Sequence, residues 1–140
     1  MAASHLSVSD EVAAALAERR PVVALETTIV SHGMPWPDNF KTALAVEDEV
    51  RSGGATPAAI AVIDGRIKVG LTRAELETLS HSKGVLKLSS ADLAHALVAK
   101  RDGAMTVAAT MVAAKLAGIT VFATGGIGGV HRGAEESFDI

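Results

Sequence analysis

Residues 21–30 have the sequence PVVALETTIV, and this stretch decides the fold class. It is rich in β-branched residues and apolar nearly throughout, which predicts a strand that is covered on both faces. Strands of this kind belong to sheets that carry helices on both sides. We therefore expect a buried strand here, interrupted by the carboxylate of Glu26.

The segments on either side of this strand have helical patterns. Ser7 and Asp10 stand in capping-box spacing and apolar residues follow at helical intervals, so a first helix is expected over residues 7–19. Residues 31–39 (SHGMPWPDN) form a loop after the strand, and Asp38 is the expected N-cap of the next helix. The order is thus helix, strand, loop, helix.

Farther along the chain, Asp64 and Gly65 predict a hairpin. They supply the positive φ angles of a type I′ turn between residues 59–63 and 66–70, which should pair antiparallel. Helices and strands then alternate: a capping-box helix from Thr72 to about Ser80, a strand over 85–89, a helix over 92–100, a helix over 106–117 closed by Gly118, and a buried strand over 119–123. This alternation predicts an α/β fold with a three-layer α/β/α core, and the hairpin makes its sheet mixed.

Composition limits the class of function. The 140 residues are 49% hydrophobic, which fits one domain over residues 1–140. The 13 Lys and Arg residues against 16 Asp and Glu give a net charge of -3, which excludes a general nucleic-acid coat. The sequence has no cysteine, which excludes disulfides, thiolate nucleophiles and iron-sulfur centres, and a cytoplasmic location is the default expectation. The longest uncharged apolar stretch, 116–130, is shorter than the ~18 residues of a membrane span, so no membrane partner is expected.

A glycine-rich segment, residues 123–133 (ATGGIGGVHRG), follows the last expected strand. Glycines let backbone N–H groups approach an anion closely, and His131 and Arg132 can add charge-assisted bonds to a phosphate. The spacing matches neither the dinucleotide fingerprint nor the P-loop. The alternative is a flexible turn between core elements.

Glu26 is the second candidate feature. A carboxylate within an apolar strand must be paired or desolvated, which makes it a candidate proton donor or acceptor. The alternative is a glutamate at the open end of a strand, exposed or bonded to a neighbouring amide. Because ligands of α/β sheets bind at the carboxyl ends of strands, Glu26 and the loop over residues 31–39 are expected to share a cleft.

Two further groups carry charge. Lys87 lies inside the expected strand over 85–89, where an ammonium group either reaches an anionic ligand or marks an exposed edge strand. Glu135, Glu136 and Asp139 offer the oxygen ligands that Mg²⁺ and Mn²⁺ accept. A solvated helix start explains Glu135 and Glu136 equally well.

Three long motifs together resemble the pseudouridine-5′-phosphate glycosidase family. They are VALETTIVSHGMPWPDN (23–39), GGATPAAIAVIDGRIKVGL (53–71) and TVAATMVAAKLAGITVFATGGIGGVHRGAEESFDI (106–140). The similarity runs from about Pro21 to Ile140 and covers roughly the first half of a full-length family member.

The resemblance implies a reaction and a set of site residues. Family members reversibly cleave the carbon-carbon glycosidic bond of pseudouridine 5′-phosphate, giving uracil and ribose 5-phosphate, as manganese-dependent homotrimers. A lysine forms a Schiff base with the opened ribose and a glutamate, matched by Glu26, handles protons at the base. Asp139 matches the metal-binding aspartate. The positions expected to bind the sugar phosphate are Lys87, Val107, Thr124, Gly125, Gly126 and His131.

One part of the family pattern lies outside the chain. The Schiff-base lysine of the family comes after its Phe-Asp-Ile-Ser segment, and the sequence stops at Ile140, so none of the six lysines is its equivalent. Two interpretations stay open: the chain is the amino-terminal half of a longer enzyme, or the gene is truncated and its product is a non-catalytic phosphosugar-binding or assembly module.

Overall fold

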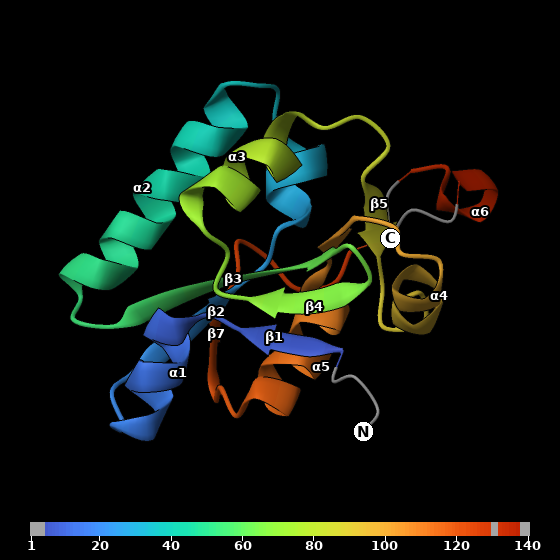
Figure 1. Ribbon diagram of the computed structural model, residues 1–140. Helices are drawn as coiled ribbons and strands as arrows, with labels where there is room; N and C mark the ends of the chain where they lie inside the picture. Colours follow the sequence, from blue (N-terminus) through green and yellow to red (C-terminus); the bar gives the residue numbers. More distant parts are fainter. Residues whose placement is uncertain (1–4, 130–131, 138–140) are drawn as a thin grey trace.

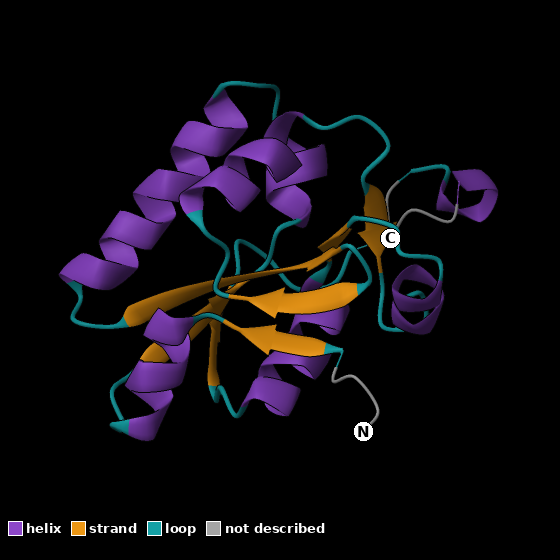
Figure 2. Ribbon diagram, in the orientation of Figure 1, coloured by secondary structure: helices purple, strands orange, loops and turns teal. Residues whose placement is uncertain are grey.

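The chain folds into three layers, with helices on both faces of a sheet (Figure 1, Figure 2). The computed structural model describes residues 5–129 and 132–137. In this part the strands are β1 (Leu6–Val8), β2 (Val22–Leu25), β3 (Thr56–Ile63), β4 (Arg66–Val69), β5 (Leu86–Leu88), β6 (Gly103–Met105) and β7 (Val121–Ala123). The helices are α1 (Asp10–Ala17), α2 (Asp38–Ser52), α3 (Arg73–His81), α4 (Leu93–Val98), α5 (Val107–Ala117), α6 (Ala134–Ser137) and the π-helical turn η1 (Ile29–Gly33).

The strand order confirms the predicted mixed sheet. The path is β1-β4-β3-β2-β7, and β6 joins β3 to β5. The hairpin strands β3 and β4 pair antiparallel, whereas β2 pairs parallel with both β3 and β7. The α/β fold class with a three-layer core is therefore confirmed.

Each face of the sheet has its own apolar core. Elements α2, α3 and η1 cover one face, and α1 and α5 cover the other (Figure 1). Val12 and Ala113 belong to the core under α1 and α5, while Phe40 and Leu76 belong to the core under α2 and α3. Within the residues that the structure describes, we find no helix with the length and apolar character needed to cross a membrane.

Strand β3 brings the ends of two other strands together. Residues 56–59, the first half of β3, pair with β2. Ala61 and Val62 pair with β6 along the same edge of β3, since β4 lies along the opposite edge. Since β2 runs parallel to β3 and β6 runs antiparallel, the carboxyl ends of β2 and β6 meet head-on beside Ile60. A junction of this kind places the residues after Leu25 and after Met105 next to each other.

Several local predictions are confirmed. Asp64 and Gly65 have φ angles of 47° and 70° in the turn between β3 and β4, as a type I′ turn requires. Thr72 and Glu75 form the predicted capping box of α3. Gly118 ends α5 in the left-handed conformation with φ of 80°. Each of these features depends on residues close together in sequence.

The start of the chain differs from the prediction. Ser7 lies in β1, a parallel partner of β4, and the first helix begins only at Asp10. Its cap is Ser9, whose hydroxyl accepts the Val12 N–H at 3.4 Å. The prediction was wrong because β4 supplies unpaired backbone groups to residues 6–8, and this distant pairing cannot be read from a local capping signal.

The strand over 21–30 is shorter than predicted. It ends at Leu25, so Glu26 follows the strand and does not interrupt it, and residues 29–33 form the turn η1. The chain leaves the ladder because the Thr27 N–H bonds to Met105 of β6 instead of continuing along β3. Asp38 begins α2 and does not cap it, since Pro37 occupies the N-cap position without a side-chain bond.

Two further predictions need correction, and one strand was missed. The strand β7 is not buried, because in the described residues it pairs only with β2 at the edge of the sheet, and Val121 is 54% exposed. The helix over 92–100 is limited to Leu93–Val98. Strand β6 was not predicted; its three residues are too few for a period-2 pattern, although all three are buried.

Candidate active site

The candidate site lies where β2 and β7 end. Leu25 and Ala123 are register partners in these two parallel strands, and each is followed by a polar residue, Glu26 and Thr124. The Thr124 hydroxyl donates to the Glu26 carboxylate, with 2.5 Å between Oγ1 and Oε1. A charge-assisted bond of this length holds the carboxylate in one orientation.

Thr124 also connects the carboxylate to the glycine-rich segment. Its hydroxyl oxygen accepts the Gly126 N–H at 3.2 Å, and the Gly126 carbonyl lies 3.0 Å from the same oxygen. Because the hydroxyl has a single proton, the closer and charged Glu26 oxygen is the preferred acceptor. A short polar chain thus runs from the Gly126 amide through Thr124 to Glu26.

A cavity of about 300 Å³ opens beside this pair. Glu26, Thr124 and Gly125 line it together with mostly apolar side chains of η1 and α2, and Met34 and Asn39 contribute from the loop and helix start. The expected cleft shared by Glu26 and residues 31–39 is therefore present. A half-buried carboxylate at an apolar cavity can transfer a proton to a bound molecule with little competition from water.

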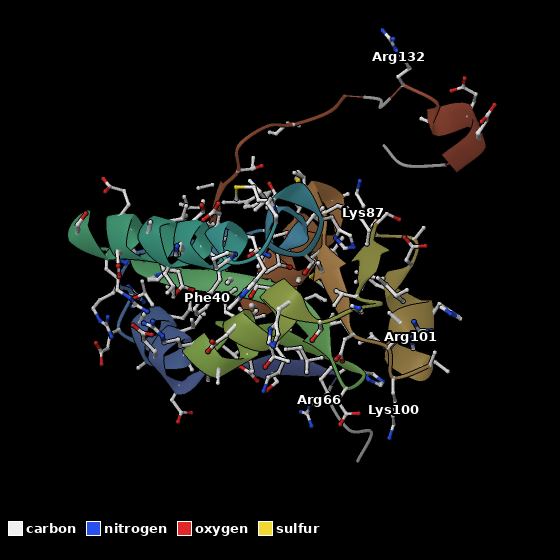
Figure 3. The ribbon with its side chains drawn as sticks, turned by 90° about the horizontal axis from the view of Figure 1, so that it is seen from above. Phe40, Arg66, Lys87, Lys100, Arg101 and Arg132 are labelled. Carbon is white, nitrogen blue, oxygen red and sulfur yellow. The ribbon has the colours of Figure 1, made fainter. Side chains whose placement is uncertain are left out.

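The glycine-rich segment leaves open space around its backbone. A Cβ atom built on Gly125 or Gly126 would meet no other atom within 4 Å, so neither glycine is required by packing among the described residues. Gly128 and Gly129 have φ of 79° and 96°, which side chains rarely adopt. Figure 3 shows Arg132 directed away from the body of the domain, so this arginine does not reach the cavity.

Lys87 and Val107 are not among the residues that line the cavity, and they lie in β5 and α5. Lys87 is the middle residue of β5, which pairs on one side with β6, and its side chain is half-buried. Figure 3 shows it on the side of the domain where residues 124–129 leave β7. Val107 is the first residue of α5, directly after the junction of β2 and β6. The structure thus joins Glu26, Thr124 and Gly125 at one cavity, while Lys87 lies in β5 and Val107 begins α5.

The metal-ligand and histidine predictions fall at the end of the chain. His131 and Asp139 lie outside the described residues. In residues 5–129 and 132–137 there is no group of three or more His, Asp or Glu side chains that could hold a metal ion. Glu135 and Glu136, the other carboxylates considered, are exposed on α6. A metal site at Asp139 stays a prediction.

Two polar residues of the site were missed from the sequence. Thr27 is completely buried and Thr106 is half-buried, and both make hydrogen bonds at the junction of the strands. Each lies one position from a predicted site residue, Glu26 or Val107. A threonine inside an otherwise apolar predicted strand, next to a candidate catalytic group, is the signal that would have found Thr27.

The geometry of this site agrees with the family relationships of the chain. A family model described as Indigoidine synthase A like protein matches residues 11–140. The chain belongs to the indigoidine synthase A-like family. Members of this family include proteins named for the activity that the motifs suggest, and the resemblance stated above is confirmed.

Two such members illustrate the similarity. The chain is 62% identical over 136 residues to a Solibacter usitatus protein and 61% identical over 132 residues to a Roseobacter denitrificans protein, both named pseudouridine-5′-phosphate glycosidase. The alignments cover 97% and 94% of this chain but 46% and 43% of the two family members. The chain thus spans about half the length of the curated relatives it matches.

Solved structures of the family have the same fold. The prealnumycin C-glycosynthase AlnA, determined in complex with ribulose 5-phosphate, is 48% identical, with a TM-score of 0.80 over 96% of this chain and 43% of that chain. An indigoidine synthase A-like protein from Thermotoga maritima is 29% identical, with a TM-score of 0.80 over 95% of this chain and 44% of that chain.

Proposed function

We propose that the full-length protein to which this chain corresponds reversibly cleaves the C-glycosidic bond of pseudouridine 5′-phosphate, giving uracil and ribose 5-phosphate. The single observation that carries the proposal is the Glu26 carboxylate, which is held by Thr124, lines an apolar cavity and lies next to a glycine-rich segment. The names of relatives at 62% and 61% identity support the same reaction.

In this reaction Glu26 is the proton-transfer group. In a C-glycoside a carbon of the base is bonded directly to the sugar, and there is no exocyclic oxygen to protonate. Cleavage of this bond therefore requires that the base carbon receives a proton. Glu26 is placed to deliver that proton and to remove it in the reverse direction, because Thr124 occupies one of its oxygens and leaves the other for the substrate. The electron sink on the sugar side is the Schiff base of a lysine that the resemblance places after the matched half.

The sugar phosphate is proposed to bind along the glycine-rich segment. The open space at Gly125 and Gly126 admits an anion close to the backbone. Lys87, on the same side of the domain, supplies a positive charge, and His131 and Val107 complete the set. Phosphosugar binding by a family member, the glycosynthase with ribulose 5-phosphate, supports this assignment.

The cofactor, assembly and location belong to the same proposal. We propose Mn²⁺ at Asp139, assembly as a homotrimer and action in the cytoplasm. Dialysis against a chelator followed by re-addition of Mn²⁺ or Mg²⁺ tests the metal, because activity should return only with the metal that the site prefers. Sedimentation equilibrium tests the trimer, and fractionation of cells tests the location.

A turnover assay tests the proposed reaction. The full-length protein is incubated with pseudouridine 5′-phosphate and Mn²⁺, and uracil release is followed by chromatography, with uridine 5′-phosphate as the control substrate. Release of uracil from the C-glycoside supports the proposal. Binding of ribose 5-phosphate without any uracil release would instead identify a non-catalytic phosphosugar-binding module.

A further inference from the structure

The junction between β2 and β6 is held by one buried hydroxyl. Thr27 has 0% of its surface exposed. Its hydroxyl donates to the Ile60 carbonyl of β3 at 2.7 Å and accepts the Met105 N–H of β6 at 2.9 Å. Its own N–H donates to the Met105 carbonyl at 3.3 Å. One side chain therefore joins three strands where no regular ladder continues.

A second threonine extends this junction to β5. The Thr106 hydroxyl donates to the Leu88 carbonyl at 2.9 Å, and the Thr106 N–H donates to the same carbonyl at 3.0 Å. Leu88 is the last residue of β5. We call Thr27 and Thr106 the threonine clasp, because together they connect the carboxyl ends of β2, β5 and β6.

The clasp adjoins three predicted site residues. Glu26 directly precedes Thr27, Lys87 directly precedes Leu88, and Val107 directly follows Thr106. The ladder of β2 with β3 ends at Leu25, so the bonds of Thr27 are what direct the chain just after the ladder. The clasp thereby fixes the backbone that carries Glu26 just after β2 and ties it, through β6, to the end of β5, which carries Lys87.

We propose that Thr27 and Thr106 are positioning residues of the enzyme. Thr27 holds Glu26 at the cavity, and Thr106 holds β5 so that Lys87 stays on the same side of the site. The inference rests on the proposed function and deepens it. Thr27 is fully buried, so solvent does not replace a donor or acceptor lost there, and a shift of about 1 Å costs about 10²-fold in rate.

The test compares four variants of the full-length protein. Thr27→Val removes the hydroxyl at constant shape, Thr27→Ser keeps it, and Thr106→Val removes the second hydroxyl while the Thr106 N–H still holds Leu88. Thr110→Val is the matched control, because Thr110 is also 0% exposed but its hydroxyl has no hydrogen-bond partner among the described residues. Uracil release is measured for each at a temperature well below its melting point.

The expected results separate positioning from stability. Thr27→Val should lower kcat about 10²-fold with little change in KM, since proton transfer needs the Glu26 geometry. Thr27→Ser should stay within about twofold of the wild type. Thr106→Val should raise KM about tenfold, because Leu88 then keeps only the bond from the Thr106 N–H and Lys87 is held less firmly. Thr110→Val should match the wild type. A Thr27→Val protein that melts lower but keeps its kcat would overturn the proposal for Thr27.

Further measurements keep the test decisive. If Thr27→Val does not fold, the KM of Thr106→Val decides, and a KM equal to that of Thr110→Val overturns the clasp. If the wild type releases no uracil, the proposed reaction is wrong, and calorimetric binding of ribose 5-phosphate decides instead. Binding about tenfold weaker in Thr106→Val than in Thr110→Val then supports the clasp. Equal binding of ribose 5-phosphate by these two variants, or no binding by the wild type, overturns the clasp.

Discussion

At the scale of single residues, the site depends on a carboxylate and a hydroxyl that are 98 positions apart in the sequence. Thr124 orients Glu26, and the same hydroxyl accepts the amide of Gly126. A carboxylate held this way has one oxygen free to exchange a proton with a bound molecule. The two predictions at this scale separate that role from a purely structural one.

The first prediction concerns Glu26→Gln in the full-length protein. Glutamine keeps the shape and accepts the Thr124 hydrogen bond but transfers no proton at neutral pH, so kcat should fall about 10²-fold or more while KM changes little. Steady-state kinetics of uracil release measures both. Glu49→Gln, an exposed carboxylate on α2, is the control. Near-normal turnover with a lower melting temperature would assign Glu26 to stability alone.

The second prediction concerns the glycine-rich segment. Gly126→Val should raise KM for the phosphosugar, because its side chain fills the open space in which the backbone amides meet the phosphate. A lower kcat is also expected where phosphate binding orients the reacting carbon. Calorimetry with ribose 5-phosphate gives the affinity directly. Unchanged affinity in a folded Gly126→Val protein would make the segment a simple turn.

At the scale of elements, Gly70 allows the start of α1 to pack closely against the end of β4. Gly70 has φ of 82°, and a Cβ atom there would run into Ser9 Oγ, the cap of α1, and lie 2.7 Å from Val12 Cγ2. Gly54 has nearly the same φ, 83°, with nothing within 4 Å. The two glycines therefore have nearly the same φ but differ in the space around them.

This difference gives the third prediction. Gly54→Ala should cost about 1 kcal/mol of unfolding free energy, for the left-handed backbone alone. Gly70→Ala should cost about 2 kcal/mol more, since α1 must also move away from the sheet. Urea unfolding of both variants measures the difference. Equal losses would show that the contact between α1 and β4 is loose.

The capping box of α3 gives a fourth prediction, on pH. Although burial acts to raise the pKa of Glu75, the hydrogen bonds from Thr72 and the ammonium of Lys68, 2.9 Å away, hold this pKa below its ordinary value. A carboxyl group whose pKa is lowered by folding contributes stability above its unfolded pKa, and loses it as the pH falls through the folded value.

Glu75→Gln should therefore lower the unfolding free energy at neutral pH by about 1 kcal/mol and reduce its decline toward acid pH. Urea unfolding between about pH 7 and about pH 3 measures both effects. Glu77→Gln, an exposed glutamate of the same helix, is the control and should follow the wild type. A parallel loss of stability in wild type and Glu75→Gln at acid pH would contradict the prediction.

At the scale of the whole molecule, the fifth prediction concerns the 140-residue chain by itself. The resemblance places the Schiff-base lysine of the family after the matched residues, so we predict that the chain, with its six other lysines, releases no uracil and forms no trapped adduct. The measurement is borohydride reduction after addition of ribose 5-phosphate, followed by mass spectrometry. Stoichiometric labelling of one lysine would show that the nucleophile lies within these residues.

The amino-acid sequence by itself determined the features whose causes are local. The turn at Asp64 and Gly65, the capping box of Thr72 and the helix stop at Gly118 each depend on the conformations and hydrogen bonds of neighbouring residues. The apolar run around Glu26 likewise indicated a strand covered on both faces, because that pattern has few other stable solutions. The fold class followed from these local features in their order along the chain.

The tertiary structure alone decided where strands end and which side chains meet. Strand β1 exists because β4 offers it a partner, β7 is exposed because it lies at the edge of the sheet, and β2 stops at Leu25 because Thr27 bonds to β6. Glu26 and Thr124 become neighbours only when β2 and β7 pair. The physical reason is that each of these contacts joins residues far apart in sequence, whose pairing no local propensity encodes.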